Sequence, residues 1–425
     1  MTKLREAGAI ILGKTNVSEW GISRSENCKS GWSALYGQAV EAFHEDQDPQ
    51  GSSSGSAIAM SLKLASFAIG GETCGSILYP AQKNGVVGLK PTVGLTSRFG
   101  VIPLNPEQDS VGPITQYVMD SAIILQAIAG KDDRDSATEQ IPFDTIPDYK
   151  AACQRNALDG VRVAVPMSVY KVADSDPEVG VALRDAISKF RDFGAIIVDN
   201  VGFEHWEPGS GQREDLFEDV LLREAFEGFF ANLVANPHQI ENISDLIEFT
   251  KNKSEEEYEK YGANWFESAR DAPGTSKSEQ FLSVKARMED LGDDIARLLD
   301  KYGCDIILAT SSADLPLDLG RLPGIQVPLG FYPSDREIVR NAKGMVTKGP
   351  DIPYGITLTG HRFSEEKLLA CAYAFEQSTL IVRQNQERLW IKPHSYTQDA
   401  EKVAITNSKS GRGEHGPRAG LEAFI

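Results

Sequence analysis

Three serines lie between two glycines at residues 51–55, and an alanine-rich apolar run follows them directly. The stretch from Pro49 to Ala59 reads PQGSSSGSAIA, and it has two interpretations. Glycine and serine in this proportion are typical of flexible linkers. They are equally typical of a tight turn that leads into a helix and presents hydroxyl groups at its N-terminus. A linker would not be followed at once by a well-patterned core segment, so the sequence favours the turn.

A second loop of the same kind follows 24 residues later, GGETCGSILYP, with Ser76. The residues between Ser52 and Ser76 predict a short helix over 56–64 and a buried strand over 65–71, which would bring the chain back to where it began. Because glycines flank both serines, backbone N–H groups there can approach a ligand closely, as they do in an oxyanion hole. From the residues alone, a helix N-cap and a turn serine explain the pattern about as well.

Alternating helix and strand patterns predict an α/β fold for the rest of the chain. Strands are expected at 9–13, 160–166, 304–310 and 353–360, helices at 118–129 and 364–380, and a charged, mostly helical segment over 214–299. The opening helix and strand have no strand ahead of them, so we expect the first strand or strands of the sheet to be missing. The polar, glycine-rich residues 396–425 are expected to form a disordered tail.

Composition argues against several classes of protein. Lys and Arg number 43 against 61 Asp and Glu, a net charge of −18, so nucleic acid and anionic membranes are not expected partners. No apolar run approaches the roughly 18–20 residues that cross a bilayer, and the N-terminus does not resemble a signal peptide. The five cysteines and six histidines lack disulfide or metal-ligand spacing. We therefore expect no metal, and a cytoplasmic location by default, with the true N-terminus left open.

The stretch GSSSGSAIAMSLKLASFAIGGETCGSILYPAQKNGVVGLKPTVGL closely resembles the signature of the amidase signature family of serine hydrolases. LREAGAIILGKTNVSEW and GWSALYGQ upstream, and DSVGPITQYVMDSAIILQAIAGKDDRD, DIILAT, LPGIQVPLG and PYGITLTGHRFSEEKLLACAYAFEQST downstream, resemble further family segments, so the resemblance spans most of residues 4–380. GSSSGS with TExxGS is most similar to the peptide-amidase-like branch. The resemblance implies one domain over 1–395, with a signature core at about 48–130 and a helical variable region at about 205–300. It also implies a mixed, mostly parallel central sheet with helices on both faces.

Family membership would imply hydrolysis of a carboxylic amide, on a non-peptide or C-terminal amide C–N bond, through a serine acyl-enzyme and without a cofactor. In the family's Ser–Ser–Lys triad, Ser76 would be the nucleophile. Ser52, preceded by an unusual cis peptide bond, would relay the proton between Ser76 and a neutral lysine. The oxyanion hole would be formed by the backbone N–H groups of Thr73, Cys74, Gly75 and Ser76.

Three further residues are candidates for the substrate side of the site. Ser53 would help to order its loop, and Tyr79 and Trp32 would line the pocket for a small-molecule or peptide amide. Packing explains Tyr79 equally well and Trp32 better. Asp109 and Ser110 are expected to hold a neighbouring loop rather than to act in catalysis.

Several positions depart from the family pattern. Gln50, Ser54, Cys74 and Leu78 replace the commonest family residues, and AVEAF at 39–43 stands where an Asn-Pro-Tyr-like run is usual. Cys74 could be a nucleophile, but a small loop filler is the better explanation because no histidine lies in the motif.

The family's catalytic lysine has no counterpart here, because counting back from Ser52 to its usual position runs off the chain. Lys14 and Lys90 match other family lysines, and Lys90 is expected at the surface or at a sheet edge. Two alternatives to hydrolysis therefore stay open. One is a truncated or degenerate amidase-fold protein without catalysis, which the missing lysine favours. The other is a subunit of an amidotransferase, although no complex-forming segment is obvious.

Overall fold

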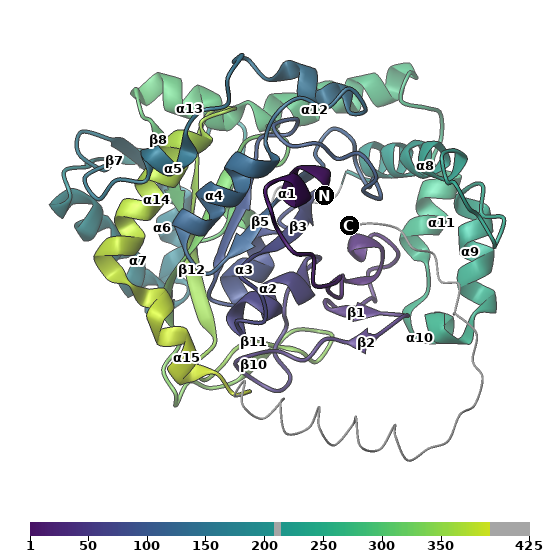
Figure 1. The fold of residues 1–425 in the computed structure, drawn as a ribbon, viewed down its shortest axis with the longest axis horizontal. Coiled ribbons are helices and arrows are strands. Elements are labelled where there is room, and N and C mark those ends of the chain that lie inside the picture. Colours follow the sequence, from purple (N-terminus) through teal and green to yellow (C-terminus); the bar gives the residue numbers. More distant parts are fainter. Residues whose placement is uncertain (208–213, 392–425) are drawn as a thin grey trace.

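An eight-stranded sheet forms the centre of the computed structural model, which describes residues 1–207 and 214–391 (Figure 1). The strand order is β3–β5–β4–β9–β12–β8–β6–β7. Its strands are β3 (Ala68–Glu72), β4 (Val87–Lys90), β5 (Ser110–Thr115), β6 (Arg162–Pro166), β7 (Ile196–Val201), β8 (Ile306–Ala309), β9 (Gly324–Phe331) and β12 (Pro353–Thr359). Two small hairpins lie outside it, β1 (Trp32–Ser33) with β2 (Gly37–Gln38) and β10 (Val339–Arg340) with β11 (Val346–Lys348).

The sheet is mixed, as predicted, but the expectation that most of it is parallel is wrong. Among the described strands, β6 pairs in parallel with β7 and β8, and the other pairings in this sheet are antiparallel. Parallel neighbours need a crossover, which α6 (Met167–Asp174) and α7 (Pro177–Asp192) supply between β6 and β7. A pattern of alternating helices and strands does not reveal which strands pair with each other in the sheet. Whether a pair is parallel or antiparallel depends on that choice of partner.

Helices cover both faces of the sheet. Gly88 of β4 faces α3, where a Cβ atom would meet Ala81 and Ile77. Val87 and Leu89 point the opposite way, into the large core that α4 and α14 share. The helices of this part are α1 (Thr2–Glu6), α2 (Ser54–Ser61), α3 (Leu78–Lys83), α4 (Val118–Ile128), α5 (Tyr149–Ala152), α14 (Glu365–Thr379) and α15 (Asn385–Arg388).

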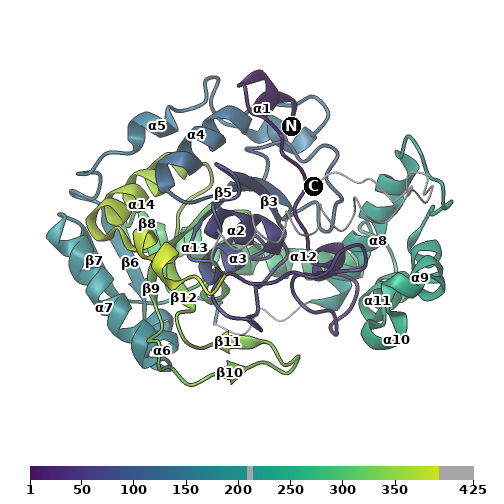
Figure 2. The same cartoon turned by 60° about the horizontal axis from the view of Figure 1, so that its bottom comes forward.

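A second group of helices lies beside the sheet (Figures 1 and 2). Three of them, α8 (Asp215–Ala231), α9 (Ile243–Asn252) and α11 (Asn264–Asp271), pack against one another around the rings of Phe226, Phe230 and Phe266. Trp20 from the N-terminal segment packs against Phe226 and Phe266 and so joins this group to the sheet domain. The remaining helices are α10 (Tyr258–Tyr261), α12 (Glu279–Gly292), α13 (Asp294–Tyr302), and the short 3₁₀ turns η1 (Glu19–Ile22), η2 (Ser136–Gln140), η3 (Ser254–Glu256), η4 (Ser312–Asp314) and η5 (Ile381–Gln384).

Residues 9–13 do not form the buried strand that their apolar pattern predicts. They follow α1 without regular structure, and Ile10 and Leu12 are 84% and 75% exposed. An apolar alternation produces a strand only where another strand is available to pair with it. Here α1 is instead tied to the end of α4, because the Lys3 ammonium group donates to the carbonyl oxygens of Ala129 (2.9 Å) and Gly130 (3.1 Å).

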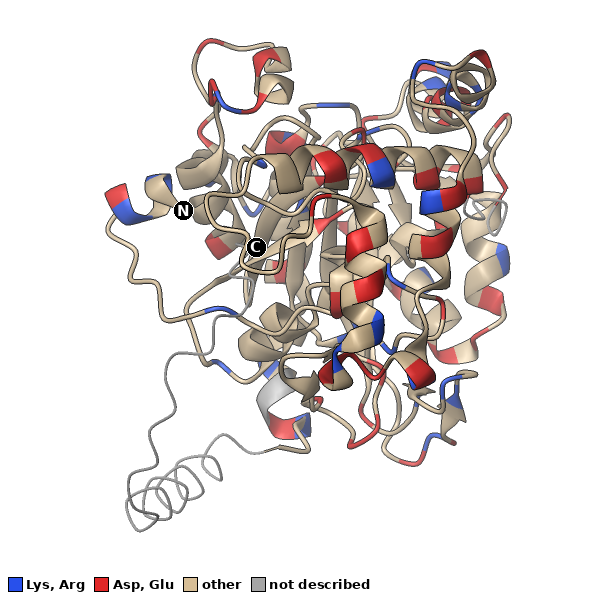
Figure 3. Ribbon diagram, turned by 90° about the vertical axis from the view of Figure 1, so that its right-hand side faces the viewer, with Lys and Arg blue, Asp and Glu red and all other residues tan. Residues whose placement is uncertain are grey.

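Acidic and basic residues are interspersed along the outer helices (Figure 3). Within the described ranges, every helix is too short or too polar to cross a bilayer. The expected tail at 396–425 lies outside the described residues.

Candidate active site

The structure brings the two serine loops together. Helix α2 begins at Ser54, within the Gly/Ser stretch at 51–55, and strand β3 returns the chain to the second loop, which leads into α3. The backbone N–H of Ser53 donates to the carbonyl oxygen of Ser76 at 3.1 Å. The Ser53 hydroxyl donates to Gly71 O (3.0 Å) and accepts from Gly71 N–H (3.1 Å). Ser53 therefore fastens the two loops to each other, and its hydroxyl is engaged by the backbone.

Ser52 lies at the junction. The peptide bond between Gly51 and Ser52 is cis, which confirms this part of the resemblance. The Ser52 carbonyl oxygen accepts from the N–H groups of Ser18 (3.0 Å) and Ser54 (2.8 Å), so the loop is held on both sides. Ser52 and Ser76 are 7% and 8% exposed. The two residues are therefore both largely shielded from solvent at the junction of the loops.

The loop that carries Ser76 is also held from the side of β5. The Thr73 hydroxyl donates to Asp109 Oδ1 at 2.6 Å, and Asp109 also accepts from the backbone N–H of Leu104 at 2.9 Å. Burial raises the pKa of Asp109 to about 6, although these donors favour its charged form. Asp109 thus positions the loop, which is the part that the sequence suggested for it.

Gly75 shapes the turn before Ser76. Its φ angle is +78°, and the Tyr79 ring occupies the space that a Cβ atom at Gly75 would need. Tyr79 is half-buried, and its hydroxyl contacts Ser312. In this structure the Tyr79 ring packs against the loop that carries Ser76.

Trp32 lies away from this loop. Its ring is 3% exposed and packs against Tyr261, with the two ring centroids 4.1 Å apart. Packing between the N-terminal segment and α10 therefore accounts for Trp32, and contact with a substrate stays a prediction.

Two buried carboxyl groups, which the sequence did not single out, lie under the loop. Glu72 ends β3, and its Oε2 accepts from the N–H groups of Ile77 (2.6 Å) and Leu78 (2.9 Å). Asp318, from the segment before β9, contacts the Glu72 carboxyl group, the Cys74 thiol and the Gly75 N–H. Burial and the neighbouring Asp318 carboxylate raise the pKa of Glu72 to about 8. Glu72 stands inside the TExxGS motif and could have been noticed, whereas nothing in the sequence marks Asp318.

Lys90 is part of the same polar group, and its expected place at the surface or at a sheet edge is wrong. It is fully buried on β4, between β5 and β9. Its ammonium group donates to Leu322 O at 2.8 Å and lies 4.0 Å from Asp318 Oδ1. A buried ammonium group needs a counter-charge, and Asp318 supplies it.

Cys74 is not poised as a nucleophile. Cys74 is an exposed residue, but desolvation by the surrounding protein, together with Asp318 and Glu218, raises the pKa of its thiol well above the usual value. A raised pKa leaves little thiolate at neutral pH. Ser76 is therefore the better nucleophile candidate in this loop.

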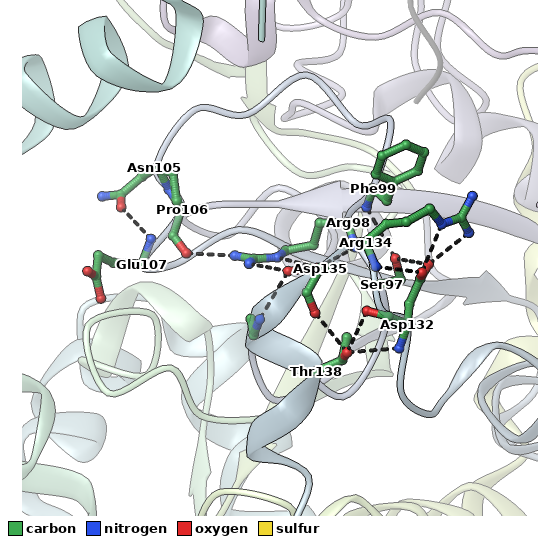
Figure 4. A network of polar contacts seen from close by, with 11 residues as sticks. Ser97, Arg98, Phe99, Asn105, Pro106, Glu107, Asp132, Arg134, Asp135 and Thr138 are labelled. Carbon is green, nitrogen blue, oxygen red and sulfur yellow. Dashed lines mark hydrogen bonds and ion pairs between the residues drawn. The ribbon is translucent and has the colours of Figure 1, made fainter. Parts of the chain in front are cut away.

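A cavity of about 170 Å³ has Asp109 among its lining residues, and the polar contacts of Arg98 and Arg134 beside it are drawn in Figure 4. Its polar wall contains Arg98, whose guanidinium group pairs with Asp135 at 2.8 Å and donates to Pro106 O at 2.6 Å. Arg134 pairs with Asp132 at 2.9 Å and lies over the Phe99 ring. Both arginines are already neutralised, so the cavity has no strong attraction for an anion. Among the described residues, no group of three or more His, Cys, Asp or Glu could hold a metal ion.

The family model described as Amidase matches residues 1–369 of the chain. This chain belongs to the amidase family. A putative amidase of Arthroderma benhamiae is 42% identical to it over 385 residues, which are 89% of this chain and 64% of the relative. A glutamyl-tRNA(Gln) amidotransferase subunit of Syntrophobacter fumaroxidans is 32% identical, over 89% of this chain and 76% of that relative. The native peptide amidase from Stenotrophomonas maltophilia superposes with a TM-score of 0.78 at 33% identity, over 89% of this chain and 76% of that structure.

Membership of the amidase family confirms the resemblance found in the sequence, and the match to the peptide amidase structure confirms the central sheet flanked by helices. The chain spans 64% of the length of its Arthroderma relative. The activities of the longer relatives are therefore assigned to this chain only as proposals.

Proposed function

We propose that this chain carries the nucleophilic half of an amide-hydrolysing site. The Ser76 oxygen attacks the carbonyl carbon of a small-molecule or peptide amide, the C–N bond breaks, and the amine leaves with a proton. Water then hydrolyses the Ser76 ester to the free acid. One observation carries the proposal: Ser76 and Ser52 lie on two loops that are hydrogen-bonded to each other.

The backbone supplies the electrostatic part of the proposed site. The N–H groups of Thr73, Cys74, Gly75 and Ser76 are the candidate donors for the oxyanion. Main-chain donors held in this way stabilise the tetrahedral intermediate, and the loss of one typically costs about 3–4 kcal/mol of activation free energy. Ser52 would pass the Ser76 proton to a base.

This proposal does not assign the general base that would accept the Ser76 proton. The alternative of an amidase-fold chain without catalysis stays open, because this proposal assigns no residue as the base. The alternative of an amidotransferase subunit has support from a relative of 32% identity. The GSSSGS and TExxGS motifs and the match to peptide amidase favour a self-contained amidase over such a subunit.

A fluorophosphonate probe tests whether Ser76 is a nucleophile in this chain. We expect covalent labelling of the folded chain, lost in Ser76→Ala and kept in Ser66→Ala, because Ser66 is an exposed serine between the two loops. Circular dichroism checks that each variant is folded. Labelling that persists in Ser76→Ala, or a folded chain that is never labelled, would reject Ser76 as the nucleophile. In the second case the non-catalytic alternative stands. Release of ammonia or amine from peptide amides then measures turnover.

A further inference from the structure

We propose that Glu72 and Asp318 share one proton and act as a pair of positioning residues that hold the loop of Ser76 from below. The inference rests on the proposed role of Ser76 and adds the groups that keep its loop in place. Neither carboxyl group needs to touch a substrate.

Glu72 holds the rear of the loop. One of its oxygens, Oε2, accepts the two N–H groups at the entrance to α3, those of Ile77 and Leu78. The residue is 2% exposed, and its other oxygen, Oε1, has no hydrogen-bond donor among the described residues. A buried carboxylate oxygen without a donor is costly, so this oxygen calls for a proton nearby.

Asp318 holds the front of the loop. Its carboxyl group contacts Glu72, the Cys74 thiol and the Gly75 N–H. The residue is 6% exposed, and its Oδ1 likewise has no hydrogen-bond donor among the described residues. The two carboxyl groups thus touch each other, and each has one oxygen without a donor.

A single proton between the two carboxyl groups would satisfy both oxygens that lack a donor. If one carboxyl group is protonated, its O–H donates to the other, and the pair carries one negative charge. Lys90, 4.0 Å from Asp318, balances that charge. Two ionised carboxylates would leave a surplus negative charge in a buried place.

The surroundings favour retention of this proton at neutral pH. The titratable and charged groups that face the pair are Lys90 on β4, Cys74 on the loop, Tyr79 on α3, Glu218 on α8, and Glu365 on α14, which acts on Lys90. Lys90, the Cys74 thiol and the Gly75 N–H favour the charged form of Asp318, but burial outweighs them, and the remaining groups are acids that oppose a second carboxylate. The pKa of Glu72 is raised to about 8, first by burial and then by Asp318. The pKa of Asp318 is raised as well, chiefly by burial.

Loss of the shared proton would loosen the loop. Above pH 8 the two carboxylates repel each other, one bound to residues 77–78 and the other to residues 74–75. The Ser76 loop would then lose its geometry although no catalytic group has titrated.

Glu72→Gln tests the pair, because glutamine copies the protonated acid: its oxygen can accept the two N–H groups and its NH₂ can donate to Asp318. The first measurement is the rate of fluorophosphonate labelling of Ser76 between pH 6 and 10. We expect the rate of the unaltered chain to fall above pH 8, and the Glu72→Gln rate to exceed it about tenfold at pH 9, as for one ionisation. Glu72→Ala should label slowly at every pH. Asp314→Asn, a buried acid on the same segment as Asp318, should keep the unaltered profile.

The second measurement detects the proton itself. The infrared difference spectrum between pH 7 and pH 9.5 should show the loss of one more protonated carboxyl C=O band in the unaltered chain than in Glu72→Gln, in which Glu256 and Glu376 still release their protons over this range. If this additional loss is absent, or if the two labelling profiles coincide, the shared proton is wrong. If the additional loss is present but Ser76 is never labelled, the shared proton stands and the proposed nucleophile falls.

Discussion

Gly75 is a residue at which backbone conformation and space both require glycine. Its φ angle is +78°, a region that other residues rarely adopt, and the Tyr79 ring fills the space of a Cβ atom. The turn before Ser76 therefore depends on the absence of a side chain.

Gly75→Ala should abolish fluorophosphonate labelling of Ser76, by at least about 100-fold, because the loop must move away from Tyr79 to admit the methyl group. Gly100→Ala is a matched control, since Gly100 has a φ of +80° but has no atom within 4 Å of the place that a Cβ atom would take. It carries the conformational penalty without the clash, so its labelling should stay near that of the unaltered chain. Equal losses in both variants would show that strain, and not the Tyr79 ring, is decisive.

Glu41 is a residue whose burial the sequence only hinted at, through the unusual run at 39–43. It is 1% exposed, and both of its carboxylate oxygens lack a hydrogen-bond donor among the described residues. Burial, with the Asp48 carboxylate, raises its pKa well above the usual value. The folded chain therefore keeps a proton on Glu41 that the unfolded chain releases above about pH 4.5.

Glu41→Gln should gain stability relative to the unaltered chain as the pH rises above 5. Because the folded-state pKa is raised, the Glu41 side chain makes folding less favourable with rising pH, by up to about 1.4 kcal/mol per pH unit, and glutamine has no such dependence. Urea denaturation of both chains at pH 5, 6, 7 and 8 measures the difference. A difference that does not change with pH would mean that Glu41 ionises normally.

At the scale of elements, Arg24 ties the N-terminal segment to the helices beside the sheet. It is fully buried, and its guanidinium group donates to Gly262 O (2.8 Å), Glu256 Oε2 (2.9 Å) and Glu256 O (2.8 Å). A single side chain thus joins two segments more than 230 residues apart.

Arg24→Met should destabilise the chain by about 3–5 kcal/mol at pH 8, because it leaves the Glu256 carboxyl group buried without its partner. Arg184→Met is the control: its ion pair with Asp174 is exposed on both sides and should contribute less than about 1 kcal/mol. Chemical denaturation of the two variants gives both values. Similar losses in the two variants would contradict the special role of burial.

The sequence predicted the positions of helices and strands along the chain better than it predicted how they are arranged in the fold. The expected strands at 160–166, 304–310 and 353–360 and the helices at 118–129 and 364–380 correspond to β6, β8, β12, α4 and α14. The strand at 9–13 was wrong because a strand needs a neighbour, and local pattern says nothing about neighbours. The meeting of the two serine loops could be predicted because the helix and strand that join them are local patterns. Asp318 was missed because only the folded sheet brings it to residue 72.

At the scale of the whole molecule, buried acids should set the pH dependence of stability. Several carboxyl groups have raised pKa values, chiefly through burial: Glu72 (about 8), Asp109 (about 6), Glu256 (about 7) and Glu376 (about 7). A raised folded-state pKa means that stability is present at low pH and is lost as the pH rises through that value. Others, such as Asp135 and Asp176, have pKa values lowered by their ion pairs, so they change the stability of the chain only below about pH 4.

We therefore expect the melting temperature to be highest near pH 5 and to fall between pH 5 and pH 8. Added salt should reduce the part of this fall that comes from the net charge of −18 and leave the buried part unchanged. Thermal denaturation at four pH values and two salt concentrations separates the two contributions. A melting temperature that rises from pH 5 to pH 8 would contradict the prediction.

The position of β9 between β4 and β12 has a consequence for the synthesis of the chain on the ribosome. Both serines have been made by residue 76, but Asp318 and β9 follow about 240 residues later, roughly 12–50 s at ordinary rates of translation. Throughout that interval β4 exposes an edge that only the late strand can cover. A nascent chain in that state is a candidate substrate for chaperones, and Asp318 can support the Ser76 loop only after this segment has been made.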